Sequence, residues 1–198
     1  MATKAKCLKC VEYLMRQNKL EKENARLMLQ LSRDEVTGVY SRFGFSETAK
    51  YLISSLRERK KKSGERRLSH VNDDNIEHLA LLFIDLDNFK PINDTLGHEG
   101  GDQLLTTFAE FLETQVRHAD IVGRLGGDEF VVLLTEDNLL SGKKVAKKIR
   151  DIVKDFIFHI DSKKVFVDFS CGVSSTSEGV YDLKKLMRKA DLRMYEDK

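Results

Sequence analysis

Acidic residues stand at two points of this sequence where an apolar run ends. Two glycines separate a pair of apolar runs and are followed by Asp128 and Glu129, which predicts a β-hairpin with two carboxylates at its tip. Another apolar run ends at Asp85, which adds a third carboxylate at a strand end. Three carboxylates brought together repel one another unless a cation lies between them, and Mg²⁺ prefers such oxygen ligands. The cluster therefore predicts a site for two Mg²⁺ (or Mn²⁺) ions that support phosphoryl or nucleotidyl transfer.

The segment that follows Asp85 offers groups suited to a nucleotide. Pro91 fits the first turn of a helix, where free backbone N–H groups can face phosphates and Lys90 adds positive charge. These N–H groups belong to Asn88, Phe89 and Lys90. Further along, Asn93 and Asp102 supply an amide and a carboxylate, which suit the N1–H and 2-amino donors of guanine. The segment therefore indicates a guanine nucleotide.

The elements expected around these residues alternate and indicate an α+β fold, in which helices cover a largely antiparallel sheet. We expect helices over residues 41–57, 102–116, 141–156 and 183–195, and strands over 79–85, 121–125, 130–134, 156–160 and 165–173. The sequence has 198 residues, of which 41% are apolar and 33% charged. This is enough for one domain with its own core plus an appendage.

The appendage is the stretch before residue 33. Residues 4–31 lack glycine and proline and mix leucine, methionine and charge, which predicts a helix. Its weak apolar stripe supports two compatible interpretations: a helix that pairs with a second copy of the chain, or a linker from an upstream sensor domain. We therefore assign residues 1–32 to a linker or dimerisation helix and residues 33–198 to the domain.

A basic stretch at residues 57–67 follows the first helix expected in the domain, and polar sequence continues to residue 75. We expect a solvated, mobile loop here, with contact to an anionic partner or a nucleic acid as the alternative. The net charge of +2 is too small to indicate nucleic-acid binding by itself. We therefore expect no nucleic-acid partner.

Targeting signals are not evident in the sequence. No apolar run approaches ~18 residues and the N-terminus has no apolar signal core, so we expect neither a membrane span nor export. Three cysteines, an odd number, indicate a reducing compartment, and we expect a cytoplasmic protein. Cys7 and Cys10 have the spacing of half a zinc site; unpaired helix cysteines are the simpler interpretation, and a metal shared by two copies is the alternative.

Four blocks of the sequence resemble the GGDEF domain, the diguanylate cyclase family. The signature stands at residues 126–130, and similar blocks occur in the family's order at 34–42, 85–102 and 190–198. The resemblance implies a fold like that of nucleotide-polymerising palm domains and adenylyl cyclases. It also implies a dimer that condenses two GTP into cyclic di-GMP and two pyrophosphates. Each 3′-hydroxyl would attack the α-phosphate of the GTP bound to the other subunit.

The resemblance further implies roles for individual residues. Asp85 and Asp128 would bind the metal ions, together with the backbone carbonyl of Leu86. Glu129 would assist a metal ion or the attacking hydroxyl. The remaining residues would bind GTP: Asn93 and Asp102 at guanine, Asn88, Phe89, Lys90 and Lys198 at the phosphates, and the backbone of Gly126 and Gly127 in close approach to the nucleotide.

A product-inhibition motif also fits the family. Arg117 and Asp120 match Arg-x-x-Asp five residues before the signature and would bind cyclic di-GMP, with a surface salt bridge at a helix end as the alternative. Asp197 stands where the family usually has a small residue, which puts a negative charge near the phosphates. The family's second basic contact to the triphosphate falls after Lys198. We therefore keep two alternatives: a catalytically weak domain that senses GTP or cyclic di-GMP, and a related reaction that joins GTP to ATP.

Overall fold

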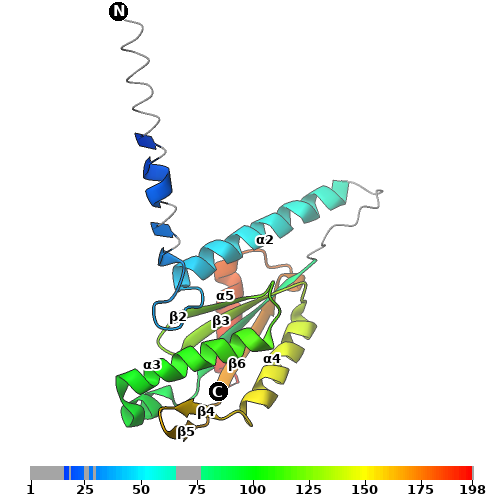
Figure 1. Ribbon diagram of the computed structural model, residues 1–198. Coiled ribbons are helices and arrows are strands. Elements are labelled where there is room, and N and C mark those ends of the chain that lie inside the picture. The colour runs from blue at the N-terminus through cyan, green and yellow to red at the C-terminus, as the bar shows by residue number, and fades with distance from the viewer. Residues whose placement is uncertain (1–15, 18, 25–26, 29, 66–76, 198) are drawn as a thin grey trace, which may run out of the picture.

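The computed structural model describes residues 16–17, 19–24, 27–28, 30–65 and 77–197. An antiparallel sheet with the strand order β2-β3-β1-β6 forms the centre of the domain (Figure 1). Its strands are β1 (Leu79–Leu86), β2 (Ile121–Gly126), β3 (Glu129–Thr135) and β6 (Phe169–Ser175). The helices around it are α2 (Arg42–Glu65), α3 (Phe89–Gln115), α4 (Leu139–Val153) and α5 (Leu183–Tyr195). The expected α+β fold, a largely antiparallel sheet covered by helices, is confirmed.

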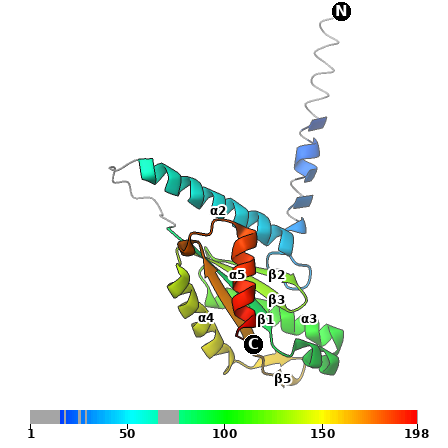
Figure 2. The same cartoon turned by 180° about the vertical axis from the view of Figure 1, so that it is seen from behind.

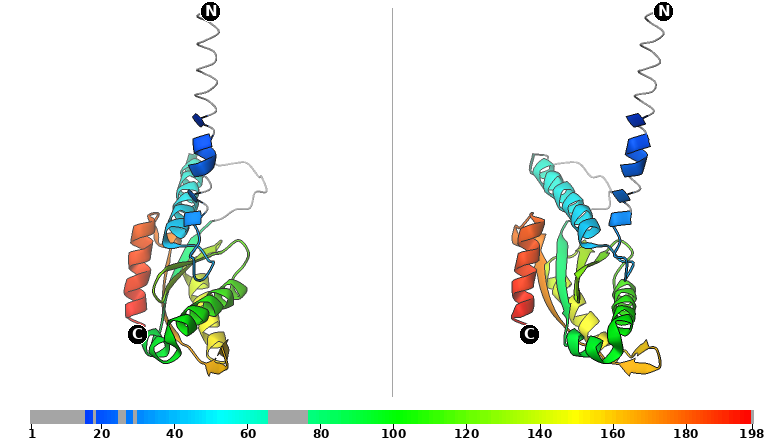
Figure 3. Two further views of the ribbon diagram at one scale, coloured as in Figure 1. Left: turned by 60° about the vertical axis from the view of Figure 1, so that its left-hand side comes forward. Right: turned by 90° about the vertical axis from the view of Figure 1, so that its left-hand side faces the viewer.

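Helices cover both faces of the sheet, so its strands are apolar on both sides. Alternate residues of β1, starting from Leu79, pack with α2 and α5, and those starting from Ala80 pack with α3 and α4. Figure 3 shows the sheet between red α5 on one side and green α3 on the other. On the α3 side, the ring of Phe108 lies 5.3 Å from Phe130 and 6.1 Å from Phe169, centroid to centroid. This packing holds the ends of β1, β3 and α3 in a fixed arrangement.

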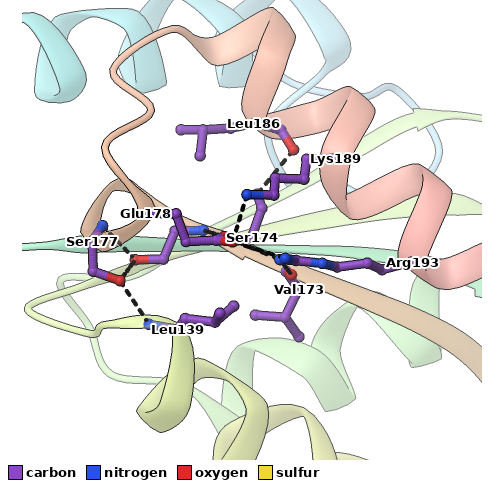
Figure 4. Close-up of polar contacts among 9 residues, drawn as sticks. Leu139, Val173, Ser174, Ser177, Glu178, Leu186, Lys189 and Arg193 are labelled. Atoms are coloured by element: carbon purple, nitrogen blue, oxygen red, sulfur yellow. Dashed lines mark hydrogen bonds and ion pairs between the residues drawn. The ribbon is translucent and has the colours of Figure 1, made fainter.

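The end of β6 is tied to α5 by Glu178, which lies in the short 3₁₀ helix η1 (Thr176–Glu178) (Figure 4). Its carboxylate accepts hydrogen bonds from Arg193 at 2.8 and 3.0 Å and pairs with Lys189 at 2.6 Å. The hydrogen bond from Arg193 lowers the pKa of Glu178 from its ordinary 4.5 to about 2. These contacts fix α5, and with it the residues that follow, against the sheet. Figure 2 shows the lower end of α5, in red, beside the ends of the strands.

The basic stretch is helical where the structure describes it, which corrects the expected loop. Helix α2 continues to Glu65 instead of ending near residue 57. Arginine, lysine and glutamate are good helix formers, and the described side chains between Arg57 and Lys61 are exposed to water. Favourable helix propensity therefore extends the helix beyond its apolar face. The remainder of the expected loop, residues 66–75, lies outside the described residues.

Two other helices differ from the expected ranges. Helix α3 starts at Phe89, as expected for a first turn at Pro91, and continues into the helix expected from residue 102 through a kink at Gly97, whose φ of 78° and ψ of 169° are not helical. The glycine accommodates this positive φ, which a side chain would strain. Helix α4 starts at Leu139 rather than residue 141 because the Asn138 side chain accepts hydrogen bonds from the first backbone N–H groups. It ends at Val153 rather than residue 156.

The strands expected at 156–160 and 165–173 are divided differently. A short hairpin is formed by β4 (Phe158–Ile160) and β5 (Lys163–Val165), so residues 163 and 164 belong to a strand instead of a connection. Asp161 adopts a φ of 51° in the two-residue turn between them, a conformation that aspartate tolerates well. The long strand begins only at Phe169.

The described part of the N-terminal appendage is helical at residues 16–17, 19–24, 27–28 and 30–31, as expected. Its described large apolar side chains are exposed: Leu20, Leu27, Met28 and Leu31. Cys7 and Cys10 lie outside the described residues. Within the described ranges, no helix is both long enough and apolar enough to cross a membrane.

Candidate active site

The pairing of β1 with β3 brings the acidic residues together. Asp85 is paired with Glu129 in the register of the two strands. One residue further on, the backbone N–H of Leu86 donates to the carbonyl oxygen of Asp128 at 3.3 Å. The hairpin tip therefore lies against the end of β1, and Asp85 and Glu129, 44 positions apart in sequence, meet at one end of the two central strands.

The turn between β2 and β3 requires glycine. Gly126 and Gly127 have φ values of 134° and 56°, and a bulge falls between Arg124 and Gly126. A Cβ at either glycine would meet no protein atom within 4 Å. The constraint on these positions is therefore backbone conformation, and the space beside them is open to a ligand.

Arg124 fixes the position of this turn. Its Nε and Nη2 donate to the carbonyl oxygen of Gly127 at 3.0 and 2.8 Å, and its Nη1 pairs with Asp34 at 2.9 Å. Asp34 also accepts from the hydroxyl and the backbone N–H of Thr37. Burial opposes the charge of Asp34, but the hydrogen bonds from Thr37 and Arg124 outweigh it and lower the pKa of this carboxyl. Sequence reasoning missed this role, although an arginine inside an apolar strand already indicated a buried partner.

A cavity of about 550 Å³ opens where β1 ends and β3 begins. It is lined by Asp85, Leu86, Asp87, Asn88, Phe89, Lys90, Pro91, Asp128, Ser170 and Asp197. The cavity brings together two of the predicted metal-binding carboxylates, the predicted carbonyl ligand and the first turn of α3. Asp87 is held by Ser170, whose hydroxyl donates to it at 2.8 Å. The remaining predicted residues, Glu129, Asn93, Asp102, Gly126 and Gly127, lie outside this lining.

Asn93 and Asp102 lie on the two sides of the kink in α3. A Cβ at Gly101 would lie 2.1 Å from Oδ1 of Asn93, so the Asn93 side chain rests directly on the residue before Asp102. Asn93 is also within hydrogen-bond distance of His98, 3.3 Å from Nδ2 to Nδ1. Asp102 is exposed. The kink at Gly97 thus brings Asn93 against Gly101, the residue next to Asp102.

Glu129 lies in an electrostatically unfavourable position. Burial raises the pKa of its carboxyl, and the negative charges of Asp85, Asp128 and Asp191 raise it further. Arg42, 4.0 Å away, partly offsets the effect. A cation beside these carboxylates would relieve the repulsion. The sequence motif gave no indication that Asp191 and Arg42 act on this carboxyl.

The carboxylates on the cavity suit a metal ion that arrives with a nucleotide. The described residues contain no group of three or more His, Cys, Asp or Glu side chains arranged to hold a metal ion. Mg²⁺ is commonly held by one or two carboxylates completed by substrate phosphates and water. Asp85 and Asp128, with the carbonyl of Leu86 nearby, fit that mode of binding.

The predicted inhibition motif lines a separate cavity of about 560 Å³. Asp120 accepts from the backbone N–H of Arg117 at 2.9 Å and from the backbone N–H and hydroxyl of Thr135 at 2.8 and 3.1 Å. The Arg117 guanidinium lies 3.8 Å from the buried carboxylate of Asp137. Asp120 therefore also organises the turn between α3 and β2. The ion pair made by Arg117 involves Asp137 rather than the motif's own aspartate.

Comparison with known proteins defines the family. A sequence model described as "Diguanylate cyclase, GGDEF domain" matches residues 31–198, and the chain belongs to this family. It is 39% identical over 122 residues to diguanylate cyclase A of Treponema denticola, covering 62% of this chain and 33% of that protein. It is 35% identical over 185 residues to diguanylate cyclase TpbB of Pseudomonas aeruginosa, covering 90% of this chain and 38% of that protein. The chain thus spans about a third of the length of these curated relatives.

Solved structures support the same fold. The crystal structure of the GGDEF domain of TpbB from Pseudomonas aeruginosa superposes with a TM-score of 0.68 at 30% identity, covering 81% of this chain and 90% of that one. The coiled coil and GGDEF domain of DgcB from Caulobacter crescentus, in complex with c-di-GMP, gives a TM-score of 0.71 at 19% identity. That comparison covers 94% of this chain and 91% of the other and supports the fold alone.

Proposed function

We propose that this protein is a diguanylate cyclase, which condenses two GTP into cyclic di-GMP and two pyrophosphates. The observation that carries the proposal is the single cavity lined by Asp85, Asp128 and the first turn of α3. It combines ligands for a hard cation with backbone N–H groups suited to phosphate. Membership of the GGDEF family and the names of the relatives support the same reaction.

The carboxylates of Asp85 and Asp128, with the Leu86 carbonyl, are proposed to bind Mg²⁺ (or Mn²⁺). Bound there, two such ions would activate the attacking hydroxyl and stabilise the leaving pyrophosphate. Glu129 assists the metal ions or the hydroxyl. The other residues bind GTP: Asn88, Phe89, Lys90 and Lys198 at the phosphates, Asn93 and Asp102 at guanine, and Gly126 and Gly127 beside the nucleotide. Lys198 lies outside the described residues.

The reaction requires two subunits. Each 3′-hydroxyl forms a bond to the α-phosphorus of the GTP on the opposite subunit, and each α–β phosphoanhydride bond breaks to release pyrophosphate. The helix within residues 1–32 would bring two copies together or connect the domain to an upstream sensor. Holding both nucleotides face to face converts a rare encounter into an intramolecular step. We propose a cytoplasmic location for this chemistry.

Arg117 and Asp120 are proposed to bind cyclic di-GMP and inhibit the enzyme. The cavity that they line supports this role. The guanidinium of Arg117 is exposed, although its partner Asp137 is buried, and it can turn to a phosphate or guanine acceptor. Arg117→Ala, which leaves Asp120 to organise its turn, would remove this inhibition.

The proposal is tested by incubating the purified protein with GTP, ATP and Mg²⁺ and identifying the products by mass spectrometry. Cyclic di-GMP is the expected product. A mixed cyclic dinucleotide would retain the chemistry and correct the nucleotide specificity. Binding of GTP with no product would support the alternative of a sensor domain and contradict the proposed enzyme.

A further inference from the structure

Asp197 is an acidic residue on the proposed nucleotide cavity. It follows α5 and lines the same cavity as Asp85, Asp128 and the first turn of α3. The triphosphate of GTP would therefore approach a carboxylate that no metal-binding role requires. The negative charges of the carboxylate and the triphosphate repel each other. An Asp197 without a compensating positive charge would therefore weaken binding of GTP.

Arg150, in the last turn of α4, supplies the compensating charge. Its guanidinium forms an ion pair with both carboxylate oxygens of Asp197, with Nη1 3.3 Å from Oδ1 and Nη2 in contact with Oδ2. The guanidinium lies 5.5 Å from the ring centroid of Phe169, which is buried at the start of β6. The side chains of Arg150 and Asp197 are partly buried, with exposed fractions of 29% and 32%. A two-pronged arginine–carboxylate pair beside an aromatic ring has a defined geometry.

Asp197 is fixed by the backbone as well. Its Oδ2 accepts a hydrogen bond from the N–H of Cys171 at 3.0 Å. Strand β6 lies at the edge of the sheet, so this N–H points away from the neighbouring strand. The carboxylate therefore stays beside the cavity rather than swinging into water.

Two of the other described cations nearby are engaged elsewhere. A second cavity of about 340 Å³ also includes Asp197 and is lined by basic residues of α4 and α5. Of these, Lys147 pairs with Asp151 at 2.6 Å and Arg193 bonds to Glu178. Arg150 is the residue that forms the ion pair with Asp197.

We propose that Arg150 is a positioning residue that neutralises Asp197 and keeps the phosphate side of the cavity compatible with a nucleoside triphosphate. The inference rests on the proposed function, because it takes the triphosphate to bind beside the first turn of α3. The proposed role of Arg150 affects the binding of GTP and not the nucleotidyl-transfer step. Loss of Arg150 therefore raises the KM for GTP while kcat changes little.

A double-mutant cycle on Arg150 and Asp197 tests the proposal. Arg150→Met keeps the aliphatic length and removes the charge, and weakens binding of a non-hydrolysable GTP analogue with Mg²⁺ by about fivefold at low salt. Asp197→Asn keeps an acceptor for the Cys171 N–H and removes the repulsion. The double variant therefore returns to within about twofold of the wild-type Kd. Lys147→Met, on the same helix, is the matched control and leaves the Kd unchanged.

Calorimetric titration of the analogue gives each Kd, and thermal melting establishes that each variant is folded. If Arg150→Met destabilises the domain, Arg150→Gln replaces it in the cycle with the same expected loss of affinity, and Arg150→Lys, which keeps the charge, should bind nearly as wild type. Unchanged binding in Arg150→Met, or a penalty that Asp197→Asn does not rescue, would overturn the inference. Analogue binding with no cyclic di-GMP from wild type would contradict the proposed enzyme alone, and no analogue binding by wild type would contradict both.

Discussion

The guanidinium of Arg124 holds the carbonyl oxygen of Gly127 with two nitrogens, at 3.0 and 2.8 Å. The same side chain pairs with Asp34, which lies 90 positions earlier in the chain. One buried cation therefore connects the turn that carries Asp128 to the segment that enters the domain. The planar fork of arginine is required for this geometry, because a lysine ammonium presents a single point of attachment.

Arg124→Lys should therefore misplace the hairpin tip while keeping its charge. We expect kcat/KM for cyclic di-GMP formation to fall by roughly ten- to a hundredfold, because a small displacement of a reacting group is enough to lose that much rate. Steady-state kinetics and a thermal melt measure the two effects separately. Arg188→Lys, on the exposed side of α5, is the control. Full activity in Arg124→Lys would show that the turn keeps its position without the fork.

Gly101→Ala should disturb the proposed guanine site. The added Cβ would lie 2.1 Å from Oδ1 of Asn93, so the amide must move. We expect the KM for GTP to rise roughly tenfold, the range for loss of one polar contact to a substrate, with a smaller change in kcat. Gln103→Ala, at an exposed position of the same helix, should have no such effect. An unchanged KM in Gly101→Ala would remove Asn93 from guanine recognition.

Glu178 makes the stability of the domain depend on pH. Its pKa is lowered from 4.5 to about 2 in the folded state by hydrogen bonding to Arg193, so its contribution is present above pH 4.5 and lost as the pH falls toward 2. Glu178→Gln should lower the free energy of unfolding at pH 7 by about 2 kcal/mol, allowing for partial solvent screening. Denaturant titrations at a series of pH values measure this difference. A difference that stays constant down to pH 2 would contradict the assignment.

The fold was largely predictable because its signals are local. The unbroken apolar run in β1 indicates a strand buried on both faces, and the glycine turn indicates the hairpin that follows. The positions of Asp85 at a strand end and Asp128 in the turn predicted that the two carboxylates lie close together. The loop expected from residue 57 was wrong where the structure describes it, because high charge was taken for a loop although the residues favour a helix.

The rest of the candidate site depends on contacts between distant parts of the chain. Arg150 meets Asp197 across 47 residues, and nothing in either local sequence indicates the pairing. The kink at Gly97, which folds Asn93 toward Gly101, depends on a backbone conformation that sequence periodicity does not reveal. Roles of this kind require the three-dimensional arrangement.

The central claim is that Asp128 supports nucleotidyl transfer through the cavity at the end of β1. The most direct test is production of cyclic di-GMP from GTP and Mg²⁺, measured by mass spectrometry for wild type, Asp128→Asn and the exposed control Asp94→Asn. Synthesis should be abolished in Asp128→Asn, while wild type and the control are active and all three proteins melt cooperatively. Undiminished synthesis by folded Asp128→Asn would contradict the account.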